Sequence, residues 1–116
     1  MLLVDPDDRV RESLAGLLRI GSRCVVIGTA GTADGAILLA TQSEPDVIVV
    51  DPRLPGIDGA QLIAQLRTAA PNCRVLVLSW SETADQGSGA DAYVRKTFRP
   101  HELIDAVVNT TRRSVA

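Results

Sequence analysis

The stretch PDVIVVDPRLPGIDG, residues 45–59, decides the fold, because it sets four consecutive apolar residues, Val47 to Val50, directly before Asp51. A continuous β-branched run of this length is typical of a strand that is covered on both faces, and such strands belong to parallel sheets. In open parallel sheets the chemistry sits at the carboxyl ends of the strands. The stretch therefore predicts a buried parallel strand that delivers a carboxylate to the functional edge of the sheet.

Other apolar runs flank this strand along the chain, at residues 2–4, 24–27 and 75–78, with a weaker one at residues 92–94. Helical periods separate them. These periods consist of Val10, Leu14, Leu17 and Leu18; residues 32–41; Leu62, Ile63 and Leu66; and, after Pro100, Leu103, Ala106, Val107 and Thr110. Strand and helix alternate over short connections, which suit only crossovers between parallel strands. The order predicts an α/β fold, a five-stranded doubly wound parallel sandwich.

Length and composition limit the class of function. A chain of 116 residues supports one hydrophobic core, so we expect a single domain over residues 1–116. The net charge of -2 provides no basic surface for a phosphate backbone, so no direct nucleic-acid partner is expected. The apolar stretches are too short for a signal peptide or a membrane span. Cytoplasmic residence, without a membrane partner, is the expectation.

Two further features concern packing. Cys24 and Cys73 each begin a predicted strand and match no zinc spacing, so both are interpreted as small buried hydrophobic residues. Residues 81–91 contain no large apolar side chain and two glycines. A packed helix needs an apolar stripe, so a mobile loop or about one helical turn is predicted there.

Polar side chains follow four of the predicted strands: Asp5, Asp51, Ser79 and Lys96. Taken singly, each has an ordinary explanation, since an aspartate after a strand commonly caps a helix and a lysine is commonly solvated. Together they place two carboxylates, a hydroxyl and an ammonium at one edge of the sheet. This convergence predicts a functional site.

The sequence resembles the receiver domain of two-component response regulators over essentially its whole length. The resemblance is carried by residues 2–5, 45–59, 75–79 and 89–96. It implies a flavodoxin-like fold with strand order 2-1-3-4-5, here with the fourth helix shortened or missing. It also implies a signalling domain that is a phosphoprotein and not an enzyme, beyond Mg²⁺-assisted phosphorylation and dephosphorylation of itself.

The resemblance also implies roles for single residues. Asp51 corresponds to the phosphoacceptor and Lys96 to the phosphate-binding lysine, while Ser79 and Tyr93 correspond to the switch hydroxyl and the switch aromatic residue. The Mg²⁺ ligands would be Asp5, Asp51 and the backbone carbonyl of Arg53. The chemistry agrees, because phosphoryl transfer to a carboxylate requires that a metal and a cation neutralise the transferred charge.

Several residues depart from the family pattern. Pro6 replaces the second of two adjacent acids, so weak Mg²⁺ binding is expected unless Asp7 or Asp8 replaces it; these two residues suit the capping of the first helix. Trp80 follows the switch serine, and its indole either screens Asp51 or folds outward. Thr97 replaces a proline, so either Lys96 is aimed differently or the loop is strained.

Two functions stay open. The first is an atypical receiver that takes phosphate from a histidine kinase or phosphotransfer protein and signals to an effector or output domain, with a homodimer compatible with this role. The second is a pseudo-receiver that binds proteins without phosphorylation. A phosphatase of the haloacid-dehalogenase type is excluded because Arg53 stands where its second aspartate is needed. Residues 28–35 lack dinucleotide-loop spacing and are interpreted as turn and helix start, and His101 as a solvated residue.

Overall fold

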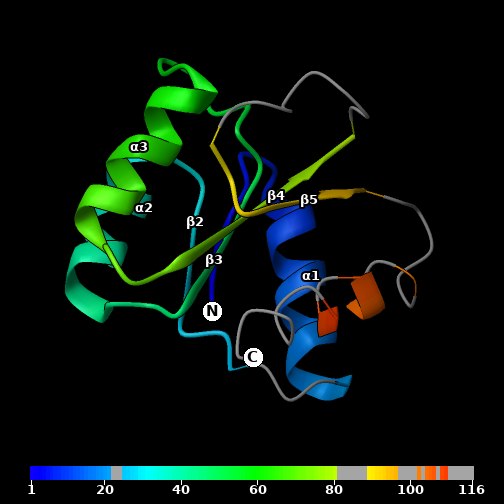
Figure 1. Cartoon of the computed structure of the whole chain (residues 1–116). Helices are drawn as coiled ribbons and strands as arrows, with labels where there is room; N and C mark the ends of the chain where they lie inside the picture. The colour runs from blue at the N-terminus through cyan, green and yellow to red at the C-terminus, as the bar shows by residue number, and fades with distance from the viewer. Residues whose placement is uncertain (22–24, 81–88, 97–101, 103, 107, 110–116) are drawn as a thin grey trace.

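The computed structural model describes residues 1–21, 25–80, 89–96, 102, 104–106 and 108–109. Within these residues, one parallel sheet has the strand order β2-β1-β3-β4-β5, which confirms the predicted fold and order (Figure 1). The elements, in chain order, are β1 (Leu2–Val4), α1 (Asp8–Gly21), β2 (Gly28–Ala30), α2 (Ala33–Ser43), β3 (Val47–Val50), α3 (Gly59–Ala69), β4 (Arg74–Ser79) and β5 (Ala92–Arg95). Among the described helices, none is long and apolar enough to cross a membrane.

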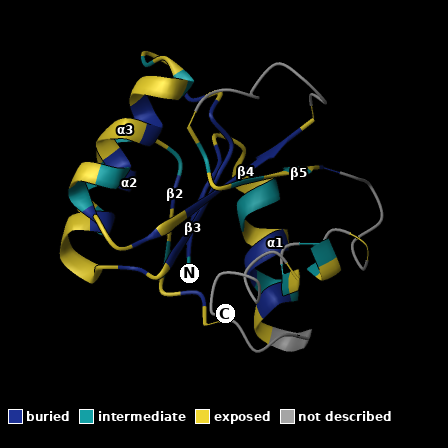
Figure 2. Ribbon diagram, in the orientation of Figure 1, coloured by how far each residue is buried: buried dark blue, intermediate teal, exposed yellow. Residues whose placement is uncertain are grey.

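Helices cover both faces of the sheet, with α2 and α3 on one side and α1 on the other (Figure 1). Alternate residues of the central strands point to opposite faces, so Ile48 and Val50 pack toward α2 and α3 while Val49 packs toward α1. All four residues of β3 are buried, as Figure 2 shows for the centre of the sheet. The uninterrupted apolar run thus reflects burial on both faces.

The prediction for the second strand is wrong. The apolar run at residues 24–27 precedes β2, which is formed by Gly28–Ala30 and pairs with Leu2–Val4 of β1. Val25 and Ile27 are 72% and 47% exposed. The strand consists of small residues, and α2 packs beside it: a Cβ on Gly28 would be in ordinary contact with Leu39 Cδ1, at 3.6 Å. The interpretation of residues 28–30 as part of a turn is also wrong, because these residues form β2.

The helix starts follow the sequence signals. Thr32 caps α2, its hydroxyl accepting a hydrogen bond from the Gly35 N–H at 3.1 Å, and Asp58 caps α3. Gly59 begins α3 against Pro52, where a Cβ would approach Pro52 Cβ to 2.9 Å. This close approach packs the start of α3 against the loop that follows β3.

The remaining predictions on packing are tested only in part. Cys73 is buried as predicted, and burial raises the pKa of its thiol. Residues 102, 104–106 and 108–109 are helical, and Ile104 and Val108 pack in the core beside α1. Other predictions lie outside the described residues. These concern Cys24, residues 81–88, Thr97, Pro100, His101, Leu103, Val107 and Thr110.

Candidate functional site

The four polar residues predicted from the strand ends lie together at the carboxyl edge of the sheet. Asp5 follows β1, Asp51 follows β3, Ser79 ends β4 and Lys96 follows β5. Each is no more than 5% exposed. The sheet order brings β1 next to β3 and β4 next to β5, so residues far apart in sequence share this edge. Four buried polar residues in one place need mutual contacts to offset their desolvation.

The ammonium of Lys96 supplies the central contact. Lys96 Nζ donates to Asp5 Oδ2 and to Asp51 Oδ2, each at 2.6 Å. The main chain of Lys96 is fixed as well, because its N–H donates to the Ser79 carbonyl at 2.7 Å. The lysine therefore points into the carboxylate pair, and the alternative in which it is aimed elsewhere is excluded.

The two aspartates are held in the same way. Asp5 Oδ1 accepts from the Asp7 N–H at 2.9 Å, and Asp51 Oδ1 accepts from the Arg53 N–H at 3.0 Å. Each carboxylate thus binds the N–H two residues ahead through Oδ1 and the ammonium through Oδ2. The two Asx turns fix both side chains to their own loops, so the pair faces Lys96 in a defined orientation.

The acids after Asp5 are committed elsewhere. Asp7 Oδ1 accepts from the N–H groups of Arg9 and Val10 at 2.9 and 3.4 Å, which is the capping geometry expected at the start of α1. Asp8 forms an ion pair with Arg11. No group of three His, Cys, Asp or Glu side chains among the described residues is arranged around a metal. Asp5 and Asp51 are the acids that face each other here.

Oxygen donors of this kind suit Mg²⁺ in chemistry. Mg²⁺ usually keeps several waters and binds through one or two carboxylates, a number that Asp5 and Asp51 match. Both Oδ2 atoms, however, already bind Lys96 Nζ. A divalent cation at this pair would either share these oxygens with the ammonium or displace it.

Trp80 lies beside the ammonium. The centroid of its ring is 5.8 Å from Lys96 Nζ, within the range of a cation–π contact, and the side chain is 41% exposed. The indole thus lies near Lys96, and this contact does not decide between the two orientations considered from the sequence, over Asp51 or folded outward. Tyr93 stands on the edge strand β5, paired with Val77, and is also 41% exposed.

Sequence reasoning missed Arg11. Its Nη1 donates to the Asp5 carbonyl at 2.6 Å, so the guanidinium ties the β1–α1 loop to α1. A Cβ on Gly31 would overlap this guanidinium, so glycine there makes room for it. The spacing of Asp8 and Arg11, three residues apart at a helix start, could have indicated their ion pair, but no sequence signal points to the bond with the Asp5 carbonyl.

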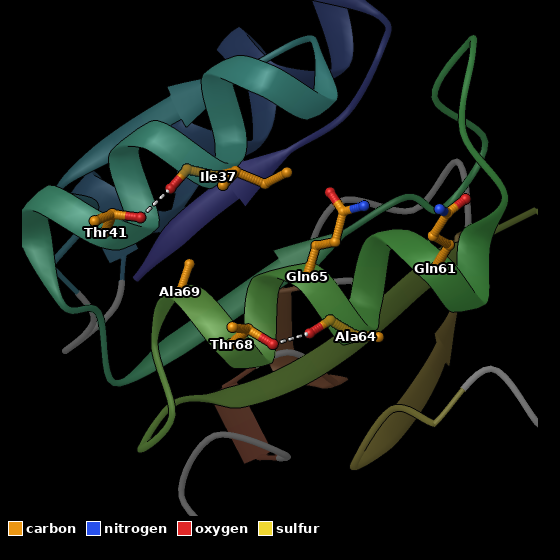
Figure 3. Close-up of a pocket in the computed structure, with 7 residues that line it drawn as sticks. All are labelled: Ile37, Thr41, Gln61, Ala64, Gln65, Thr68 and Ala69. Carbon is orange, nitrogen blue, oxygen red and sulfur yellow. Dashed lines mark hydrogen bonds between the residues drawn. The ribbon is translucent and has the colours of Figure 1, made fainter.

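The described residues also form a shallow groove away from the polar pocket. It has a volume of about 450 Å³ and lies between α2 and α3, as Figure 3 shows. The Thr41 and Thr68 hydroxyls donate to carbonyls of their own helices, at Ile37 and Ala64. The groove is lined by residues that do not titrate, so it offers no acid–base chemistry: Ile37, Thr41, Gln61, Ala64, Gln65, Thr68 and Ala69.

Comparisons with known proteins agree with this geometry. A family model described as the response regulator receiver domain matches residues 1–108. The chain is 35% identical over 113 residues to the DNA-binding transcriptional activator DevR/DosR of Mycobacterium tuberculosis, covering 92% of this chain and 52% of that protein. It is 33% identical over 110 residues to the uncharacterized transcriptional regulatory protein YxjL of Bacillus subtilis, covering 90% of this chain and 50% of that protein.

Solved structures give the same result. The signal receiver domain of the putative response regulator NarL from Mycobacterium tuberculosis superimposes with a TM-score of 0.81 at 28% identity, over 96% of this chain and 94% of that one. A two-component response regulator of the LuxR family from Aurantimonas gives a TM-score of 0.82 at 27% identity, over 97% of this chain and 84% of that one. The present chain spans about half the length of the curated relatives that it matches.

Proposed function

Because this chain belongs to the response regulator receiver domain family, we propose that it accepts a phosphoryl group on Asp51 from a histidine kinase or phosphotransfer protein. The observation that carries the proposal is the buried ammonium of Lys96 at 2.6 Å from Asp51. A carboxylate becomes a useful phosphoacceptor only where positive charge follows the transferred phosphoryl group. Lys96 supplies that charge at the end of β3.

The reaction follows from these contacts. An Asp51 carboxylate oxygen attacks phosphorus, the bond from phosphorus to the donor breaks, and the donor leaves with its electron pair. Mg²⁺, held by Asp5, Asp51 and the Arg53 carbonyl, supplies neutralisation of the phosphoryl oxygens when bound. The phosphoryl group adds about -1.5 to -2 charge and three acceptor oxygens, to which Lys96 Nζ and the Ser79 hydroxyl would donate.

The output of the switch is a change at the protein surface. Ser79 ends β4, and Tyr93 lies on the neighbouring β5 with its ring partly exposed. A hydroxyl drawn toward the phosphoryl group moves the end of β4, and the aromatic ring on β5 responds to that movement. The relatives are named as transcriptional regulators, and each is about twice as long as the region that matches this chain. This supports the proposal that the domain signals to an output domain or to an effector protein.

A second function needs a separate test, because Pro6 removes an acid and the Trp80 ring lies 5.8 Å from Lys96 Nζ. On this alternative the domain binds a protein partner without phosphorylation. The test is incubation with acetyl phosphate and Mg²⁺, followed by intact-mass measurement of the parent, Asp51→Asn and Asp34→Asn variants. Asp34 is an exposed aspartate in the first turn of α2 and serves as the matched control.

We expect the parent and the Asp34→Asn variant to gain one phosphoryl group and the Asp51→Asn variant to gain none. A phosphoryl group that maps to Asp5, or that persists in Asp51→Asn, would refute the assignment. A folded parent that gains no phosphoryl group under any donor concentration would favour the phosphorylation-independent alternative.

A further inference from the structure

Arg11 binds the loop after β1 at both of its ends. Its main-chain N–H donates to the Asp7 carbonyl at 3.1 Å, and its side-chain Nη1 donates to the Asp5 carbonyl at 2.6 Å. The second terminal nitrogen, Nη2, pairs with Asp8 at the start of α1. The Arg11 side chain is 17% exposed, so most of it is covered by protein. Pro6 lies between the two bound carbonyls and has no N–H with which to fix the loop itself.

Asp5 is held through each of its polar atoms. Its N–H donates to the Ala30 carbonyl at 3.0 Å, and its carbonyl accepts from Arg11. Its two carboxylate oxygens accept from the Asp7 N–H and from Lys96 Nζ. The Asp5 carbonyl belongs to the same short turn that orients the carboxylate, so rotation of that peptide plane would turn the carboxylate as well. The bond from Arg11 opposes this rotation.

Gly31, in the loop after β2, leaves the space in which the guanidinium lies. A Cβ at this position would overlap Arg11 Nη1 and would lie 3.0 Å from Arg11 Cζ. Gly31 is not among the glycines with a positive φ, so its main chain suits alanine and the requirement is for space alone. The guanidinium therefore lies between the loops after β1 and β2, and contacts both.

The second aspartate of the pocket provides an internal comparison. Asp51 makes a matching turn, in which its Oδ1 accepts from the Arg53 N–H at 3.0 Å, and its own N–H donates to the Val4 carbonyl at 2.8 Å. The side-chain bonds of Arg11 are to the loop after β1 and to the start of α1. Loss of the guanidinium should therefore disturb the turn of Asp5 and leave the turn of Asp51 as it is.

We propose that Arg11 is a positioning residue for phosphoryl acceptance, which holds the main chain of Asp5 so that its carboxylate faces Asp51, and that Gly31 supports this role by leaving room for the guanidinium. The inference rests on the proposed function for the reaction, whereas the geometry can be tested without phosphorylation. Arginine suits this position because its planar fork directs two nitrogens to two acceptors, the Asp5 carbonyl and Asp8. A lysine would have to reach both acceptors with one nitrogen.

Amide hydrogen exchange, measured by nuclear magnetic resonance on isotope-labelled protein, tests the geometry. In Arg11→Ala we expect the Asp7 N–H to exchange about threefold faster than in the parent, or more, because its acceptor on Asp5 is held less firmly. The Arg53 N–H, in the matching turn of Asp51, should exchange at the parent rate. Equal acceleration at both amides would mean a general loosening of the fold, and an unchanged rate at Asp7 would mean that Arg11 does not hold Asp5. Either result would overturn the proposal.

Phosphorylation by acetyl phosphate in Mg²⁺, followed by intact-mass measurement, tests the consequence for the reaction. Arg11→Ala should react about tenfold more slowly than the parent, because small displacements of a positioned group are costly in rate. Arg11→Lys restores one donor and should recover part of the rate. Arg9→Ala removes an exposed arginine of the same helix and should react like the parent. Parent rates in Arg11→Ala would refute the positioning role.

Gly31→Ala tests the same contact from the other loop, and it remains informative if Arg11→Ala does not fold. Alone, it should accelerate exchange at Asp7 and slow phosphorylation as Arg11→Ala does. Added to Arg11→Ala, it should change neither rate further, because the guanidinium that it displaces is already absent. Additive effects would contradict the proposal, since they would show two separate roles. If the parent takes up no phosphoryl group, the proposed function fails, and exchange at Asp7 still decides whether Arg11 holds Asp5.

Discussion

Replacing Lys96 with methionine should destabilise the fold strongly. Methionine keeps much of the length and apolar stem of lysine but removes the ammonium, so Asp5 and Asp51 are left facing each other without their shared partner. Both are at most 5% exposed, and each loses a charged hydrogen bond of 2.6 Å. Breaking a buried pair by removing one partner typically costs about 3–5 kcal/mol. That is a large fraction of the roughly 5–15 kcal/mol that stabilises a domain.

Urea unfolding followed by far-ultraviolet circular dichroism measures this loss. With an m-value of about 1–3 kcal/mol/M, the midpoint should fall by at least about 1 M. Arg67→Met is the matched control. Arg67 pairs with Asp91 at 3.0 Å, but both side chains are about one-third exposed, so this variant should lose no more than about 1 kcal/mol.

A further variant shows whether charge is the cause. Combining Lys96→Met with Asp5→Asn and Asp51→Asn removes the unpaired charges together with the ammonium, and should recover most of the lost stability. It also keeps the reasoning testable if the single variant does not fold. A single variant within about 1 kcal/mol of the parent, or a combined variant no more stable than the single one, would refute the argument from buried charge.

Two smaller predictions concern the surroundings of the pocket and the core. Gly31→Ala places a methyl group where the Arg11 guanidinium lies, and should lower the free energy of unfolding by about 1–2 kcal/mol through the lost bond to the Asp5 carbonyl. Gly16→Ala, with open space around it in α1, is the control and should raise that free energy by about 0.5–1 kcal/mol. Both are measured in the same urea assay. Burial raises the pKa of the Cys73 thiol, so the contribution of the protonated thiol to folding stability is complete below the ordinary thiol pKa and is lost as the pH rises through the raised value. In a Cys24→Ser background, the folded protein should therefore resist alkylation of Cys73 by N-ethylmaleimide at neutral pH. Rapid alkylation of the folded protein would contradict this.

The central strands were predictable because burial on both faces leaves a continuous apolar run in the sequence. Val47–Val50 is such a run, and β3 has these bounds. β2 was not predictable by the same criterion, since it stands at the edge of the sheet under a closely packed helix. Its residues are small, so the hydrophobic run just before it gave the stronger and misleading signal.

The convergence of the site residues was also predictable, because parallel strands bring their carboxyl ends to one edge. Their mutual geometry was not. Nothing in the spacing of Asp5, Asp51 and Lys96 says that one ammonium would bind both acids, or that both aspartates would bind the N–H two residues ahead. Those contacts depend on loop conformation and side-chain torsions, which periodicity does not specify.

Pro6 and Lys96 are best understood together. An aspartate at position 6 would add a third acid to the loop after β1, and one ammonium could then neutralise only a third of the carboxylate charge instead of half. With Pro6 there, the two remaining acids are bridged by one buried lysine, which neutralises half of their charge. We therefore expect Pro6→Asp to lower the stability of the metal-free protein and to raise its affinity for Mg²⁺, which urea unfolding and Mg²⁺ titration would measure.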